Sequence, residues 1–378
     1  MEKVRLKYLC SSYSTPITQD EIKEEGLYPV YGASGLVGYK NEYACKQVYL
    51  GIIKDGAGVG RIDQYEQQSS LLGTMAYIVP APGVNISWLR YAIMGMNLGK
   101  DISATTIPHI YFKDYGNRLV PFIDQDEQRR IADFLDRRCA EIDRVIDATQ
   151  QTIEEYKALK QSIITEAVTK GVRGPRPMKD SGVEWIGEIA EDFELKKLKH
   201  LCHILDQFRS PITADQRNQD ADVLYDYYGA SGAIDKIDGY TIDDHVMLIG
   251  EDGANLRQRN LPLMYEVNGK AWINNHAHIL KPKESVDFYY LFFALEGLDL
   301  NTYITGSAQP KLSQENLRNI LLPAPSYEEQ REIAEHIKTR IRELNRLIEI
   351  KQQLLTELEA YKKSVIYEYV TGKREVII

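Results

Sequence analysis

Two long stretches of the chain carry apolar residues at intervals of three and four, with charged and polar residues between them. They cover about 126–170 and 327–372, contain no proline, and have no glycine before their final residues. This spacing marks one face of an α-helix, and Glu, Lys, Arg, Gln, Leu and Ala favour helix. We therefore predict a helix of about 40 residues in each stretch, roughly 60 Å long.

In both predicted helices the apolar face follows a heptad repeat. The first seam consists of Leu135, Cys139, Ile142, Ile146, Thr149, Ile153, Tyr156, Lys160, Ile163 and Ala167, and the second of Ile337, Ile341, Leu344, Ile348, Lys351, Leu355, Leu358, Lys362, Val365 and Tyr369. Two seams in the same register predict an antiparallel coiled coil within one chain. Lys160 and Lys362 share a slot, where they either specify the register or extend from the edge of the seam.

The remaining regions, 1–125 and 195–326, have a shorter and more varied pattern. Runs such as "KQVYLGII", "MAYIVP", "HVMLIG" and "HAHILKP" predict strands, and "SWLRYAIMGM" and "DFYYLFFALEGL" predict short helices. Residues 171–194, rich in Gly and Pro, read as a linker and lead-in anchored around Trp185 and Ile186. The predicted fold class is α+β, with two globules, two long helices and a C-terminal tail that ends at 378.

The two halves of the chain repeat one design. The pentapeptide YGASG occurs at 31–35 and at 228–232, "TPIT" at 15–18 answers "SPIT" at 210–213, and "DGA" begins at Asp55 and again at Asp252. "LVPFIDQDEQRRIADFL" aligns without a gap on "LLPAPSYEEQREIAEHI". The chain is therefore predicted to be a tandem duplication with pseudo-two-fold internal symmetry.

Composition narrows the possible functions. A formal net charge of −9 argues against a general polyanion binder, although it leaves room for local basic surfaces. The four cysteines form no CxxC pair, which favours reduced structural thiols. No apolar run is long enough to span a membrane, and we expect a cytoplasmic protein.

Several chemistries lack their motifs. No glycine is followed by the Lys and Ser/Thr of a phosphate-binding loop, and the sequence contains no GxSxG, no HExxH and no Asn-Pro-Pro-aromatic tetrapeptide. His276 and His278 lie two apart, which on one face of a strand would allow metal binding, but the first half places Met75 and Tyr77 there when aligned. We expect no metal site and no catalysis.

With these motifs in view, the chain resembles the specificity (S) subunit of Type I restriction-modification systems. The likeness rests on "TGSAQPKLSQENLRNILLPAPSYEEQREIAEHI" and "MKDSGVEWIGEIAEDFELKKLK", and it extends over nearly the whole chain. The first half departs from the pattern, because it lacks the "SGVEWIGEI" lead-in and reads "ATTIPHIYFKDY" where the second reads "GSAQPKLSQEN".

The resemblance implies a DNA-recognition subunit without catalytic groups of its own. Each globule would be a target recognition domain for one half of a bipartite, asymmetric DNA sequence, and the helices would set the spacer. Two methyltransferase subunits would dock on the helices, and two restriction subunits would complete the complex in phage defence. S-adenosylmethionine, ATP and Mg²⁺ would bind those partners, with no cofactor in this chain.

Candidate DNA contacts are side chains that suit base edges or lie on Gly-bent loops. In the first half they are Tyr31, Ser34, Lys54, Arg61, Gln64, Thr105, Thr106 and His109; in the second, Tyr228, Ser231, Asn255, Arg257, Gln258, Arg259, Ser307, Gln309 and Lys311. Each set could equally be a solvated hairpin tip. Rival functions are a non-DNA interaction protein with two recognition modules, or an enzyme with a site between the globules.

Overall fold

Two long helices organise the protein. In the computed structural model, which describes residues 2–56, 58–102, 108–184, 186–217 and 221–376, they are α3 (Gln125–Lys170) and α8 (Tyr327–Val370). The chain divides into two compact units, Met1–Gln151 with Lys351–Ile378, and Thr152–Ile350. The domains predicted from sequence keep each long helix whole, whereas these two units each contain part of both helices. The reason is the antiparallel pairing, which places the start of one helix beside the end of the other.

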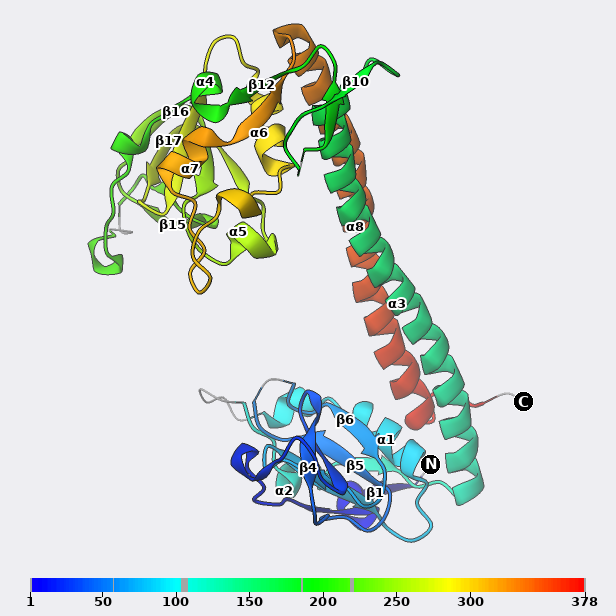
Figure 1. The fold of residues 1–378 in the computed structure, drawn as a ribbon. Helices are drawn as coiled ribbons and strands as arrows, with labels where there is room; N and C mark the ends of the chain where they lie inside the picture. Colours follow the sequence, from blue (N-terminus) through cyan, green and yellow to red (C-terminus); the bar gives the residue numbers. More distant parts are fainter. Residues whose placement is uncertain (1, 57, 103–107, 185, 218–220, 377–378) are drawn as a thin grey trace. The chain divides into compact units, whose positions relative to one another are not determined.

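Polar contacts across the seam show that α3 and α8 run side by side in opposite directions (Figure 1). In the first unit the Lys362 amine contacts both Asp143 carboxylate oxygens, at 2.6 and 2.7 Å. In the second unit the Lys160 amine donates to Asn345 Oδ1 at 2.7 Å, and burial lowers the pKa of Lys160. Both lysines therefore reach a polar group of the opposite helix, which favours their role in register, and all predicted seam positions are buried or partly buried.

The described residues of the first globule form three sheets and two short α-helices. The sheet orders are β2-β8-β5-β6, β4-β3-β7 and β1-β9. Its elements are β1 (Lys3–Arg5), β2 (Cys10–Tyr13), β3 (Tyr28–Gly32), β4 (Gly35–Lys40), β5 (Tyr49–Ile53), β6 (Ile62–Tyr65), β7 (Ser70–Leu71), β8 (Met75–Pro80), α1 (Ile86–Met94), α2 (Phe112–Tyr115) and β9 (Leu119–Pro121). One face of the larger sheet packs with α1 and the start of α3 into a core built around Trp88 and Leu135.

The second globule joins the corresponding strands into one sheet of order β13-β18-β16-β17-β14-β15, with β12-β19 and β10-β11 beside it. Its elements are β10 (Met178–Asp180), β11 (Glu188–Ala190), β12 (Glu194–Lys197), α4 (Leu198–Leu201), β13 (Cys202–Ile204), β14 (Tyr225–Gly229), β15 (Gly232–Ile237), β16 (Ile242–Gly250), α5 (Asn255–Gln258), β17 (Met264–Ile273), β18 (Ala277–Pro282), α6 (Phe288–Glu296), α7 (Gln314–Asn319) and β19 (Leu321–Ala324). The two globules therefore share one topology, as the duplication predicts.

One long strand explains why the second sheet is continuous. β17 pairs with β16 over its first part and with β14 near its end. In the first globule two shorter strands, β6 and β7, make these contacts, and Gln68 between them has φ 57°. The sheet divides between β6 and β7, at residues 66–69.

A buried glutamine joins each globule to its long helix. Gln128 accepts a hydrogen bond from the backbone N–H of Asn85, the N-cap of α1, at 2.8 Å and donates to a carbonyl five residues before it. Gln330 does the same, accepting from the N–H of Asp287, the N-cap of α6, at 2.9 Å. Sequence reasoning did not single out these residues, although the "EQR" shared by both halves carried the signal.

A second attachment uses the glycine that ends each short helix. A Cβ on Gly95 would lie 2.8 Å from Val370 Cγ2, and one on Gly297 would lie 2.5 Å from Ile164 Cγ2. Only a residue without a side chain lets α1 pack on α8, and α6 on α3, at this distance. Each globule is thus held by both long helices within its own unit.

Replacing Gln330 with Ala is expected to lower the free energy of unfolding of the second unit by about 1–3 kcal/mol, because it leaves a buried N–H and a buried carbonyl unpaired. Urea denaturation followed by hydrogen exchange of the α6 amides measures the loss. Thr339→Ala, at an exposed position of the same helix within the second unit, is the control. Equal stability of the two variants would contradict the role of Gln330 as a joint.

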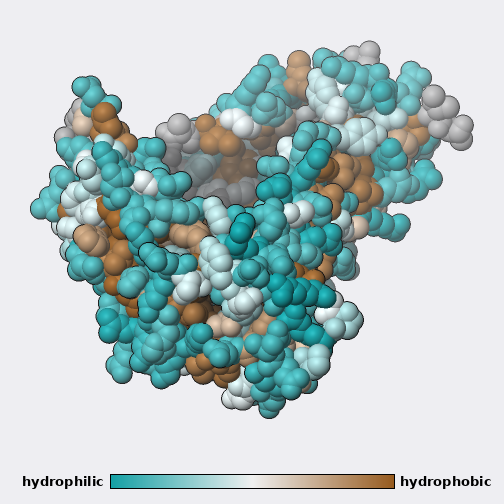
Figure 2. Space-filling model, turned by 90° about the horizontal axis from the view of Figure 1, so that it is seen from above, coloured by the Kyte–Doolittle hydropathy of each residue, from teal (hydrophilic) through white to brown (hydrophobic). Residues whose placement is uncertain are grey.

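Polar side chains dominate the face shown in Figure 2, with apolar patches between them. Among the described residues, no helix combines the length and apolar character that a membrane crossing requires.

Candidate nucleic-acid interface

Four loops of the second globule meet at one edge of its sheet. They are the YGASG turn (228–232), the segment after β16 (251–254), the segment before β18 (274–277) and the loop 305–311. Backbone hydrogen bonds join them: Asn274 N to Tyr228 O at 3.1 Å, Glu251 N to His276 O at 2.8 Å, and Gly253 N to Pro310 O at 3.1 Å. We call this set the loop edge of the second globule.

The first globule has an equivalent loop edge, formed by 31–35, 54–56, 72–74 and 108–110. Leu72 N donates to Tyr31 O at 2.8 Å, Lys54 N to Thr74 O at 3.0 Å, and Gly56 N to Pro108 O at 3.0 Å. The structure thus brings the Tyr31, Lys54 and His109 neighbourhoods together at one edge, although they are far apart in the sequence.

YGASG forms the turn of a β-hairpin in both globules. Gly32 pairs with Gly35 and Gly229 with Gly232, and the last glycine of each turn has a positive φ, 109° and 93°. A left-handed residue at this position favours glycine, which explains why the pentapeptide occurs twice.

The tyrosine and the serine of each turn differ in exposure. Tyr31 is half-buried, with its ring 4.9 Å from that of Tyr65, and Tyr228 packs against the sheet. Ser34 and Ser231 are exposed at the tips. The serines are therefore the more accessible groups of the two turns, and the tyrosines are held partly by packing.

The other candidates of the first globule form two polar groups. Asp55 accepts from Lys54 and, at 2.6 Å, from His109 Nδ1. Burial alone would raise the pKa of Asp55, but these two partners lower it. The Arg61 guanidinium donates to the carbonyl of Ala33, which helps to hold the YGASG turn in place.

Gln64 is exposed on β6. Thr105 and Thr106 lie outside the described residues.

In the second globule, two of the candidates hold the chain in place. Asn255 accepts from Leu261 N at 2.8 Å and donates to two carbonyls of its own loop. Arg259 donates to the carbonyls of Glu296 and Leu298 at the end of α6, and burial lowers its pKa. Both side chains complete the backbone hydrogen bonding of irregular segments, and their contact with DNA stays a prediction.

The remaining candidates lie closer to solvent. Arg257 is exposed and reaches the carbonyls of Ile304 and Gly306 at 3.5 and 3.4 Å. Four exposed candidates accompany it, namely Gln258, Ser307, Gln309 and Lys311. Lys311 pairs with Thr305 through both backbone groups, which closes the loop 305–311 and presents Ser307 and Gln309 at its tip.

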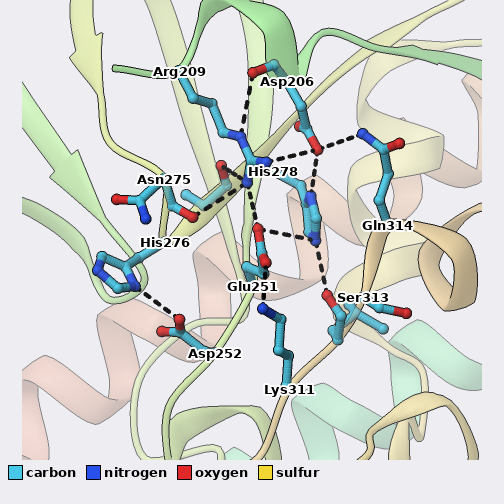
Figure 3. Close-up of polar contacts among 12 residues, drawn as sticks. Asp206, Arg209, Glu251, Asp252, Asn275, His276, His278, Lys311, Ser313 and Gln314 are labelled. Carbon is cyan, nitrogen blue, oxygen red and sulfur yellow. Dashed lines mark hydrogen bonds and ion pairs between the residues drawn. The ribbon is translucent and has the colours of Figure 1, made fainter. Parts of the chain in front are cut away.

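A buried polar network beneath this loop edge escaped sequence reasoning (Figure 3). His278 is fully buried, with Nδ1 2.7 Å from Asp206 Oδ2 and Nε2 2.8 Å from Leu312 O. Glu251 forms ion pairs with Arg209 and Lys311. Burial alone would raise the pKa of Glu251, but these two partners lower it. The network ties β13, β16, β18 and the loop 305–311 to one another.

The two histidines of "NHAH" do not form a metal pair. His276 is exposed and bonds to Asp252, while His278 points into the globule toward Asp206. Strand pairing also corrects the alignment: Ile52 pairs with Ala76 as Ile249 pairs with His278, so Ala76 is the true counterpart of His278. Within the part of the chain that the structure describes, no cluster of three metal-binding side chains occurs.

The partners of Asp206 in this network lower its pKa. Burial alone would raise this pKa, but hydrogen bonds from His278 and Gln314, with the His278 charge, outweigh it. Only a ring protonated on both nitrogens can donate to the carboxylate and the carbonyl that face it.

Two copies of one loop-bearing globule, each fixed to a shared pair of helices, define a tandem recognition protein. Residues 190–360 match the family described as Type I restriction modification DNA specificity domain. The chain is 27% identical over 351 residues to the Type I restriction enzyme MjaVIII specificity subunit of Methanocaldococcus jannaschii, covering 87% of this chain and 76% of that one. It is 30% identical over 142 residues to a putative type I restriction enzyme specificity subunit of Haemophilus influenzae, covering 38% and 36%.

The fold agrees with this relationship. A solved structure described as the structural basis of complex assembly and conformational transition of the type I R-M system superposes with a TM-score of 0.71 at 15% identity, over 99% of this chain and 98% of that one. Residues 190–360 therefore match a DNA specificity domain of Type I restriction-modification systems, and the chain is similar over most of its length to a specificity subunit of such a system.

Proposed function

We propose that each globule reads one half of a bipartite DNA target through its loop edge. The observation that carries the proposal is the convergence, in both globules, of four loops that present exposed polar side chains of the kinds that recognise base edges. The two edges differ in these side chains, with Lys54 and His109 in one and Gln309 and Lys311 in the other. Different readers imply different half-sites, and therefore an asymmetric target.

The paired helices are the proposed docking surface for two methyltransferase subunits. Within the first unit Val145 and Tyr361 are exposed on α3 and α8, at 48% and 44%. Leu159 and Leu347 are exposed within the second unit, at 43% and 42%, at positions that the duplication makes equivalent. Large apolar side chains exposed at equivalent positions of the two halves suit two copies of one partner.

The proposal assigns all chemistry to partner subunits. S-adenosylmethionine would bind the methyltransferase subunits, and ATP and Mg²⁺ two restriction subunits, while this chain supplies recognition. The experiment is reconstitution with the methyltransferase subunits, methylome sequencing to find the target, and equilibrium binding to duplexes with either half-site scrambled. Binding that ignores both half-sites would contradict the proposal and favour a protein with another ligand.

Replacing Gln309 with Ala is expected to weaken binding to the intact target by about 1–3 kcal/mol through the second half-site, since its amide suits adenine. Binding to a duplex with that half-site scrambled should not change. Asn268→Ala is the matched control, because Asn268 is exposed and pairs with His245 in the middle of β16, outside the loop edge. An equal loss on both duplexes would remove Gln309 from the readers.

A further inference from the structure

Each loop edge carries an aspartate bonded to a histidine. In the second globule His276 Nδ1 lies 2.8 Å from Asp252 Oδ2, with the histidine side chain 51% exposed. In the first globule His109 Nδ1 lies 2.6 Å from Asp55 Oδ1, with the histidine side chain 30% exposed. Both pairs lie at the surface, unlike the buried pair of His278 and Asp206.

The aspartates are equivalent, but the histidines are not. Asp55 forms a β-bridge with His109, and Asp252 forms the same bridge with Lys311. His276 instead corresponds to Thr74, since the carbonyl of each accepts from the residue before the aspartate. The same pair is therefore built twice from different loops, so duplication alone does not explain it.

The pairing fixes what each ring offers to a ligand. A carboxylate at Nδ1 keeps the proton on that nitrogen and orients the ring. In the neutral ring Nε2 is then an acceptor. In Figure 3 the ring of His276 stands apart from the buried network, and Asp252 approaches it on its Nδ1 side. The acceptor thus belongs to the exposed part of the loop edge.

We propose that His276, and His109 by the same chemistry, accepts a hydrogen bond at Nε2 from an exocyclic amino group in the major groove, with Asp252 and Asp55 as positioning residues. Adenine N6 and cytosine N4 are the amino donors in that groove. The inference rests on the proposed function and deepens it. It adds a hydrogen-bond acceptor, the histidine Nε2, to loop edges whose other candidate side chains are mostly donors.

The charged groups around each ring are few. Asp252 faces His276, and Glu251, which lies beside it in the chain, is engaged by Arg209 and Lys311. Beside His109 the charged groups are Asp55, which bonds to the ring, and Lys54, which bonds to Asp55. The uncharged ring of Tyr111 stacks on His109, with 6.3 Å between the ring centroids.

The test uses the chain reconstituted with its methyltransferase subunits and the target found by methylome sequencing. His276→Ala and Asp252→Asn are each expected to raise the Kd for the intact target about tenfold, the cost of one base contact. The Kd for a duplex with the second half-site scrambled should not change, and neither should the salt dependence of binding, because no phosphate contact is lost. His109→Ala should mirror this on the first half-site.

His203→Ala is the control, since His203 is an exposed histidine of β13 in the same globule. Hydrogen exchange of the loop-edge amides separates a lost contact from a loosened loop, and Asp252→Asn keeps the size of the side chain if His276→Ala unfolds the loop. Unchanged affinity of both variants, or an equal loss on both duplexes with a shallower salt dependence, would overturn the inference alone. If the unmodified complex does not distinguish its target from scrambled DNA, the proposed function fails and the inference with it.

Discussion

Replacing His278 with Ala is expected to lower the free energy of unfolding of the second unit by about 3–5 kcal/mol, the cost of removing one partner from a buried charged pair. Asp206 would keep its charge in a site where its side chain is 7% exposed, and the carbonyl of Leu312 would lose its donor. The loss should concentrate around β13, β18 and the loop 305–311, which His278 connects. Hydrogen exchange of these amides, compared with those of β5 and β8 in the other unit, measures it.

The control is His276→Ala, whose exposed pair should cost less than about 0.5 kcal/mol. A double-mutant cycle with Asp206→Asn isolates the interaction, and the two losses should be far from additive. Additive losses, or a His278→Ala protein as stable as the control, would show that the network contributes nothing beyond packing.

Lengthening α3 and α8 by one heptad each, after Thr149 and after Leu355, is expected to lengthen the spacer between the half-sites by about three base pairs. Seven residues add about 10.5 Å of helix, and one base pair occupies about 3.4 Å. A whole heptad preserves the seam, so both helices should still pair. The half-sites should not change, because the insertion leaves every loop-edge residue in place.

Methylome sequencing of cells that express the lengthened chain with its partner subunits reads both quantities at once. The control carries the heptad in α3 alone, which breaks the match between the seams and should abolish methylation. New half-sites with the original spacer would contradict the assignment of spacing to the helices.

The long helices were predictable because one local rule governs them. A heptad seam of apolar residues and an uninterrupted run of helix formers placed α3 within a residue of its observed start, and the duplication predicted its partner. The globules obey no such rule. Their strands pair across long stretches of chain, so the continuity of β17 depends on partners that its own sequence does not reveal.

The candidate site shows the same division. Residue type alone made Arg259 and Asn255 suitable for bases, but the ends of α6 and the loop after α5 provide backbone groups that need donors and acceptors, and these side chains satisfy them. His276 appeared as half of a possible metal pair, but it lies in the turn before β18, whereas His278 lies on that strand and points into the globule. Which polar side chain remains at the surface is decided by long-range packing, which local sequence does not encode.

The glutamine joints have a consequence for how specificity can change. Because Gln128 and Gln330 bind the N-caps of α1 and α6 in the same way, the attachment of a globule is independent of the side chains on its loop edge. A foreign globule that keeps this glutamine contact and the glycine at the end of its short helix would seat on the same helices. On the proposed function, exchanging whole globules would change the DNA target and leave the proposed docking surface on the helices as it was.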